Sequence, residues 1–250
     1  MAKLISLFKY SGTLDGFTSV HPANSDPYLK RKGGLSKERI KTDPKLNRIR
    51  ENNKEFGMMA AASKAIRDPF REVRKSVRVQ YLTPRLTHYL TKIKDLDTTS
   101  ARGYRSVKVG LESEAGKNIL LGFNFNAKKR LFSVLQKDFD LDTETGSISI
   151  PSLMPYLHLL GGMGANTVEL KSYWAKIDFE TGQSKLSKSN AVRLSVKSKP
   201  VDLLLTHDQA PQGDGVSVFV LSIVFYQTVN NVDYMLQDGS YNVADIVAVV

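Results

Sequence analysis

The chain has 250 residues, of which 41% are hydrophobic and 24% charged, and this near-average composition excludes wholesale disorder and a fibrous repeat. Cysteine is absent, which excludes a disulfide scaffold, a thiol nucleophile and a cysteine zinc site. The net charge of +11 is unevenly distributed, because residues 1–110 carry a net charge of +14 and residues 111–250 a net charge of −3. Such asymmetry is typical of a basic element that meets a polyanion or another copy of the chain. A solvated basic surface that serves solubility is the simpler alternative.

Residues 1–42 are predicted to form a basic arm that contains a β-hairpin. Strand formers at 4–10 and 17–20 flank turn-forming residues at 11–16. A hairpin by itself is only marginally stable in water, so we expect the arm to lie on another surface, either a neighbouring copy or its own domain. The apolar side chains expected to anchor it in an assembly are Leu4, Leu7, Phe8, Phe17 and Tyr28.

Residues 43–104 are predicted to be a helical segment. A capping residue precedes proline at 43–44, 68–69 and 83–84, which is the pattern of a helix start. Apolar residues follow each of these pairs at roughly helical spacing.

Residues 105–250 are predicted to form an antiparallel β-domain, because short β-branched and aromatic runs alternate there with turn signals. We expect strands at 119–125, 131–135, 147–150, 168–179, 191–196, 201–205, 216–229, 232–236 and 246–250. The predicted fold class is therefore α+β, with a basic arm and short helices followed by an antiparallel β-sandwich or barrel-like domain. The most apolar window, 216–226, has about half the length of a transmembrane helix. We therefore expect no membrane partner, and a location in the cytoplasm or in a particle assembled there.

No catalytic constellation is visible in the sequence. The four histidines, His21, His88, His158 and His207, lack zinc-site spacing. Alternating acids at 138–144 lack the glycine of a calcium loop and indicate a strand with one solvated face, with an adventitious hard cation as the alternative. The glycine-rich stretch 161–164 lacks the lysine of a phosphate-binding loop. We therefore predict neither an enzyme nor a cofactor or metal site.

The sequence feature that does indicate a binding function is a concentration of basic residues. Residues 30–50, here called the basic tract, hold nine cations against Glu38 and Asp43, and further basic residues at 67–78 recur at mostly helical spacing. Such surfaces bind phosphate backbones without sequence preference. The predicted polyanion-binding residues are Lys30, Arg31, Lys32, Lys37, Arg39, Lys41, Lys45, Arg48, Arg50, Arg67, Arg71, Arg74, Lys75 and Arg78.

Three runs in the basic half are distinctive: YLKRKGG at 28–34, RIKTDP at 39–44 and RENNKEFG at 50–57. In these runs, and in its ending from 225 to 242, the chain resembles a family of uncharacterised proteins from Bacteroidetes-type bacteria. The resemblance implies a shared architecture and a bacterial, phage or mobile-element origin. It implies no activity and no functional residue.

Two functions are consistent with these patterns. The first is a structural, self-assembling protein, a subunit of a shell, filament or phage-like particle, whose basic arm makes the contacts between subunits. The alternative is a nucleic-acid-binding or ribosome-associated protein that uses residues 30–78 as a cationic surface. The expected partners are accordingly a second copy of the chain or nucleic acid.

Overall fold

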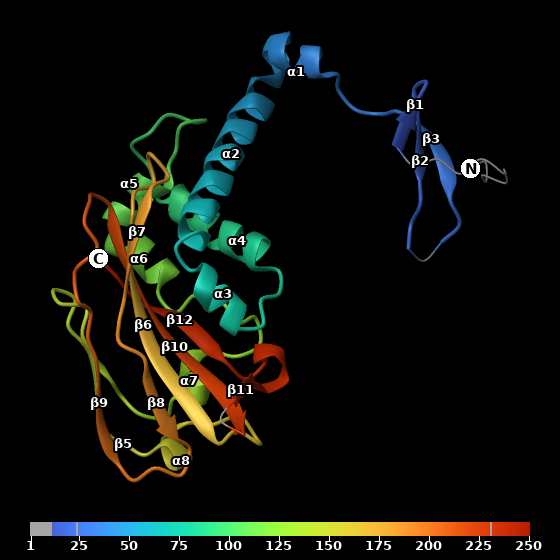
Figure 1. The fold of residues 1–250 in the computed structure, drawn as a ribbon. Helices are drawn as coiled ribbons and strands as arrows, with labels where there is room; N and C mark the ends of the chain where they lie inside the picture. Colours follow the sequence, from blue (N-terminus) through green and yellow to red (C-terminus); the bar gives the residue numbers. More distant parts are fainter. Residues whose placement is uncertain (1–11, 24, 231) are drawn as a thin grey trace. The chain divides into compact units, whose positions relative to one another are not determined.

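The structure is a computed structural model that describes residues 12–23, 25–230 and 232–250 (Figure 1). The predicted anchors Leu4, Leu7 and Phe8 lie outside the described residues. The chain divides into two compact units, Met1–Arg50 and Glu51–Val250, and each is described by itself. The domain limits predicted from the sequence, 1–42, 43–104 and 105–250, stay predictions.

The first unit contains a three-stranded antiparallel sheet in the order β1 (Gly12–Leu14), β2 (Phe17–Val20) and β3 (Tyr28–Arg31). Asp15 and Gly16 join β1 to β2, and both have positive φ, as the favoured two-residue hairpin turn requires. Two short helical elements follow, α1 (Lys37–Thr42) and the 3-10 turn η1 (Pro44–Leu46). The Ser36 hydroxyl caps α1 by accepting the Arg39 N–H at 3.1 Å, and the Asp43 carboxylate caps η1.

Most helices of the second unit precede its strands. They are α2 (Asn47–Arg67, whose residues 47–50 belong to the first unit), α3 (Arg71–Ser76), α4 (Leu82–Asp95), α5 (Val107–Glu112) and α6 (Glu114–Leu120). A buried ion cluster joins α2 to α4, because the Glu55 carboxylate accepts from Lys94 Nζ at 2.7 Å and from Arg105 Nη2 at 2.8 Å.

The main sheet is built around two long antiparallel strands, β6 (Thr167–Ile177) and β10 (Val216–Val229). Two short strands share each outer edge. β10 pairs with β11 (Val232–Met235) and β12 (Val243–Val249), and β6 pairs with β7 (Ser184–Lys188) and β8 (Val192–Ser195).

A second, three-stranded antiparallel sheet has the order β4 (Asp140–Leu141), β5 (Ile148–Leu153) and β9 (Val201–Leu205). Three short helical elements complete the unit: α7 (Leu131–Val134), α8 (Pro155–His158) and the 3-10 turn η2 (Leu236–Gly239).

The main sheet separates two hydrophobic cores. On one face, Ala175 and Val220 join side chains of α2–α6 such as Leu86. On the other face, Leu170 and Phe225 pack with the three-stranded sheet and α7 (Figure 1). Because both faces of the main sheet are covered, residues 218–225 of β10 are all buried. This explains why the strand is continuously apolar in sequence and does not alternate between apolar and polar residues.

The α+β class and the antiparallel sheets are confirmed, but the sheets do not close into a barrel. The strands predicted at 119–125 and 131–135 are wrong, because these residues belong to α6, α7 and the loop between them. Ser106 and Ser113 cap α5 and α6 with their hydroxyls, and this local bonding favours helix over strand. The strand predicted from the acids at 138–144 is reduced to Asp140–Leu141, because the Asp142 carboxylate accepts the Glu144 N–H and thereby caps a turn.

Candidate anion-binding surfaces

Seven of the nine cations in the basic tract are exposed, and their side chains make no hydrogen bond or ion pair with any described residue. They lie on every element of this segment: β3 and its continuation, α1, η1 and the first residues of α2. They are Lys30, Arg31, Lys32, Lys37, Lys41, Lys45 and Arg48. Because no carboxylate in the described chain neutralises them, their charge is available to an external anion.

The other two cations of the basic tract stabilise the chain itself. Arg39 Nε lies 3.3 Å from Asp43 Oδ2, and Arg50 Nη1 donates to the carbonyls of Ile40 at 2.8 Å and Asp43 at 2.9 Å. The Lys45 N–H and the Arg39 guanidinium lower the pKa of Asp43, which keeps its carboxylate charged as a cap. Arg39 and Arg50 therefore organise the segment that presents the seven unpaired cations.

The second group of predicted cations, at 67–78, does not lie on one continuous helix. Arg67 ends α2, where its Nε donates to the Ser63 carbonyl at 3.1 Å. Arg71, Arg74 and Lys75 lie on α3, and Arg78 follows that helix. α3 itself is fixed to β6, because Lys171 Nζ lies 2.9 Å from a carboxylate oxygen of Glu72. All five cations belong to the second unit, and Arg71 Nη2 lies 3.8 Å from Asp68 Oδ1.

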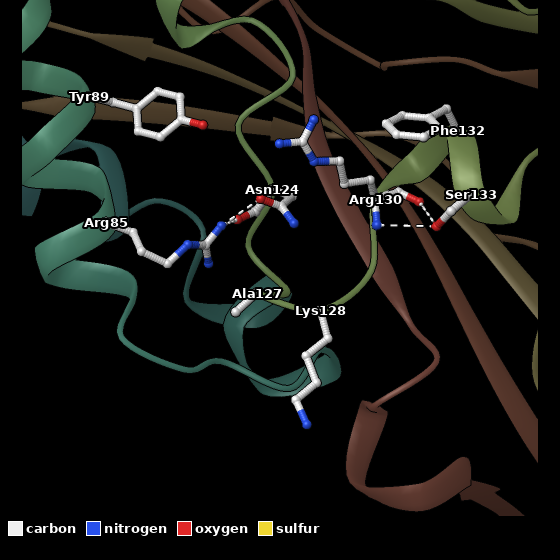
Figure 2. A pocket seen from close by; sticks show the side chains of 8 residues that line it. All are labelled: Arg85, Tyr89, Asn124, Ala127, Lys128, Arg130, Phe132 and Ser133. Atoms are coloured by element: carbon white, nitrogen blue, oxygen red, sulfur yellow. Dashed lines mark hydrogen bonds between the residues drawn. The ribbon is translucent and has the colours of Figure 1, made fainter.

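The second unit also contains a pocket of about 420 Å³ that is lined by cations and aromatic rings (Figure 2). α4 contributes two of its residues, the loop before α7 four more, and α7 itself the remaining two. The lining residues are Arg85, Tyr89, Asn124, Ala127, Lys128, Arg130, Phe132 and Ser133. None of them is a carboxylate, so the lining carries only positive formal charge.

Arg85 is the most enclosed cation of this pocket. Its Nη2 donates to the backbone carbonyl of Asn124 at 2.8 Å and to the side-chain carbonyl of the same residue. Its other terminal nitrogen, Nη1, is buried and has no partner among the described residues. Burial lowers the pKa of Arg85 and the nearby Arg130 adds to this effect, whereas Tyr89 and Asp245 oppose it. Arg85 is thus held by neutral oxygens, and no carboxylate of the described chain lies within salt-bridge distance of its guanidinium.

The loop that carries the pocket is firmly attached. Asn126 Nδ2 donates to the Asn242 carbonyl at 2.8 Å, and the Leu131 N–H donates to Asp245 Oδ2 at 2.8 Å. Asp245 lies behind the pocket lining and is only 4% exposed. Burial raises its pKa to about 6, against the opposing effects of the Leu131 N–H, Arg130 and Arg85. The cations are therefore presented by a backbone that is ordered before any ligand binds.

The pocket residues were not among those predicted from the sequence. The run Lys128-Lys129-Arg130 was a visible local signal of positive charge. The partner element was not visible, because the contacts of α4 with this loop join residues far apart in the sequence, such as Arg85 and Asn124, which are 39 residues apart.

A serine–histidine contact occurs in the main sheet. Ser172 Oγ lies 2.9 Å from His207 Nε2, and His207 Nδ1 lies 3.0 Å from Ser187 Oγ. The Ser172 side chain is buried at 2% exposure, and the His207 ring packs edge-on against Trp174. These contacts satisfy both ring nitrogens of a half-buried histidine and stabilise the packing of the sheet.

Within 12–23, 25–230 and 232–250, no cluster of three or more His, Asp or Glu side chains is arranged to hold a metal ion. The helices formed by these residues include none with the length and apolar character needed to cross a membrane. Comparison of the chain with protein-family models, curated proteins and solved structures finds no match.

Proposed function

We propose that the protein binds nucleic acid through the basic tract, with the phosphate backbone as the recognised feature. The observation that carries the proposal is the set of seven exposed cations, at 30–48, that have no carboxylate partner in the described chain. Cations of this kind bind phosphates by releasing condensed counterions, a mode that needs no base-specific geometry. The tract contains no aromatic residue, which favours backbone contact over base stacking.

Binding of a fluorescent 20-base-pair DNA at fixed low salt tests this proposal. The variant Lys30→Gln/Arg31→Gln/Lys32→Gln removes three adjacent charges from β3 and its continuation. A matched control, Lys185→Gln/Lys197→Gln/Lys199→Gln, removes three exposed and unpaired lysines of the second unit. We expect the first variant to lose at least tenfold in affinity and the control to bind like the wild type. Equal losses of affinity in both variants would show that binding depends on net charge alone and would refute a site in the basic tract.

Self-assembly through the first unit is the second candidate function, and a different observation favours it. Leu14 and Phe17 face each other across β1 and β2 and remain 59% and 50% exposed. The three strands have three or four residues each, so little apolar area is buried within this sheet. A neighbouring copy that covers this pair would stabilise the sheet. Tyr28, also predicted as an anchor, pairs with Val20 and falls on the opposite face of the sheet from Phe17.

Size-exclusion chromatography with light scattering, performed after nuclease treatment, tests the second candidate. If the first unit mediates assembly, the wild type forms large particles without nucleic acid, and Leu14→Ser/Phe17→Ser dissociates them. A wild-type monomer, or a double variant that keeps the wild-type mass, would refute assembly through this pair of side chains.

A further inference from the structure

The pocket of Figure 2 brings together cations that form no ion pair with a carboxylate of the described chain. Arg85 and Arg130 line it together, close enough for Arg130 to lower the pKa of Arg85. Neither of them, nor Lys128, forms an ion pair with a described carboxylate. Both groups are positively charged and Arg85 is partly desolvated, so an anion that enters the pocket is favoured electrostatically.

Asp245 does not serve as that anion. Its carboxylate lies behind the lining rather than in it, and Oδ2 accepts the Leu131 N–H. A single buried carboxylate leaves three cations with an excess of positive charge. That excess matches a group with close to two negative charges at neutral pH, as a phosphate monoester carries.

The remaining lining adds a hydroxyl and an aromatic surface. In Figure 2 the hydroxyl of Tyr89 and the guanidinium of Arg130 point toward the same space, while Lys128 points away to the rim. Phe132 is 68% exposed, and the Arg130 guanidinium lies 5.9 Å from the centre of its ring. An exposed ring beside an arginine is a surface on which a flat heterocycle stacks.

We propose that this pocket binds a 5′-nucleotide, with the phosphate held by Arg85, Arg130 and the Tyr89 hydroxyl and the base packed against Phe132. The volume of about 420 Å³ falls within the range of pockets that hold small ligands. The ligand is a free nucleotide or the 5′-phosphorylated end of a strand, since both present the same phosphate and base. This inference does not depend on the basic tract, because every lining residue belongs to the second unit.

Isothermal titration calorimetry on the full chain tests the proposal with 5′-AMP, adenosine and inorganic phosphate as probes. We expect 5′-AMP to bind at least tenfold more tightly than either of the others, because only it engages both parts of the pocket. A tetranucleotide with a 5′-phosphate, compared with its 5′-hydroxyl form and with 5′-AMP, distinguishes the two sources of the ligand. Absence of 5′-AMP binding, or equal binding of 5′-AMP and adenosine, would overturn the proposal.

Substitutions of two exposed side chains, Arg130 and Phe132, test the phosphate contact and the base contact separately without disturbing the core. Arg130→Gln should weaken 5′-AMP and inorganic phosphate alike, by about tenfold, and Phe132→Ala should weaken 5′-AMP alone. Lys185→Gln on β7 is the matched control and should leave both affinities unchanged. Unchanged 5′-AMP affinity in both pocket variants would contradict the site. The Lys30→Gln/Arg31→Gln/Lys32→Gln variant should bind 5′-AMP normally, so failure of either proposal is recognisable independently of the other.

Discussion

Two buried carboxylates, Glu55 and Asp245, have pKa values shifted in opposite directions. Hydrogen bonds from Arg105, Lys94 and the Gly103 N–H hold the pKa of Glu55 at about 2, although burial opposes them. Glu55 therefore contributes stability above pH 4.5 that is lost as the pH falls toward 2. Asp245, whose pKa burial raises to about 6, favours its protonated form in the folded chain. The contribution of Asp245 to the free energy of unfolding therefore increases as the pH falls from above 6 toward 4.

The first prediction follows from these opposite signs. The contribution of Asp245 to the free energy of unfolding should rise as the pH falls from 7 to about 5, and that of Glu55 should fall below about 4.5, while His207, whose pKa burial lowers, opposes the rise. Asp245→Asn removes the buried charge and keeps an oxygen that accepts the Leu131 N–H. It should raise stability at pH 7 by on the order of 2–3 kcal/mol and abolish the rise between pH 7 and 5. Urea unfolding from pH 4 to 8 measures both effects, and a variant with the wild-type slope in this range would contradict the assignment.

The second prediction concerns the cluster around Glu55. Glu55→Gln removes the carboxylate that lies 2.7 Å from the Lys94 ammonium, which is only 7% exposed, and leaves Asp95 Oδ1 at 2.8 Å as its remaining anion. Removing one partner of a buried ion pair is strongly destabilising, and because Asp95 still compensates part of the charge we expect a loss at the lower end of the usual range, about 3 kcal/mol, in urea unfolding at pH 7. Glu180→Gln is the control, because Glu180 and its partner Lys108 are both exposed. The control should change stability by less than about 1 kcal/mol, and equal effects of the two substitutions would contradict a special role for the buried pair.

At the scale of elements, the contact of α4 with α5 depends on a glycine. A Cβ on Gly110 would lie 2.1 Å from the backbone oxygen of Ile93, which a rigid helix cannot accommodate without moving. Gly57 on α2 has open space around it. We predict that Gly110→Ala lowers the free energy of unfolding by about 3 kcal/mol, whereas Gly57→Ala raises it by about 0.5–1 kcal/mol through helix propensity. Thermal unfolding of the two variants measures this difference, and a neutral Gly110→Ala would contradict the close packing.

The long strands were predictable and the short helices were not. β10 matches its predicted limits, 216–229, because a long β-branched run with turn residues on both sides has few other solutions. α6 and α7 are four to seven residues long and present too few turns for a helical period to appear in the sequence. Their formation is decided by caps such as Ser113 and by burial of residues such as Leu131 against distant strands.

For the whole molecule, the uneven distribution of charge was the most useful signal in the sequence. It identified the basic tract, because cations adjacent in sequence remain adjacent on short elements such as α1. It did not identify the pocket, whose cations come from α4 and from the loop before α7 and meet only in the folded second unit. Charges that cluster locally can thus be recognised in a sequence, whereas clusters that form only when distant segments fold together cannot.

The salt dependence of DNA binding tests the central claim, that the basic tract contacts phosphates, most directly. Each neutralised phosphate contributes about 0.9 to the slope of log affinity against log salt concentration. If the seven unpaired cations all engage a duplex, the slope is about −6 for the wild type and about −3.5 for Lys30→Gln/Arg31→Gln/Lys32→Gln. Fluorescence polarisation between 50 and 200 mM salt resolves this difference. The account predicts the shallower slope in the variant, and identical slopes in the two proteins would contradict it.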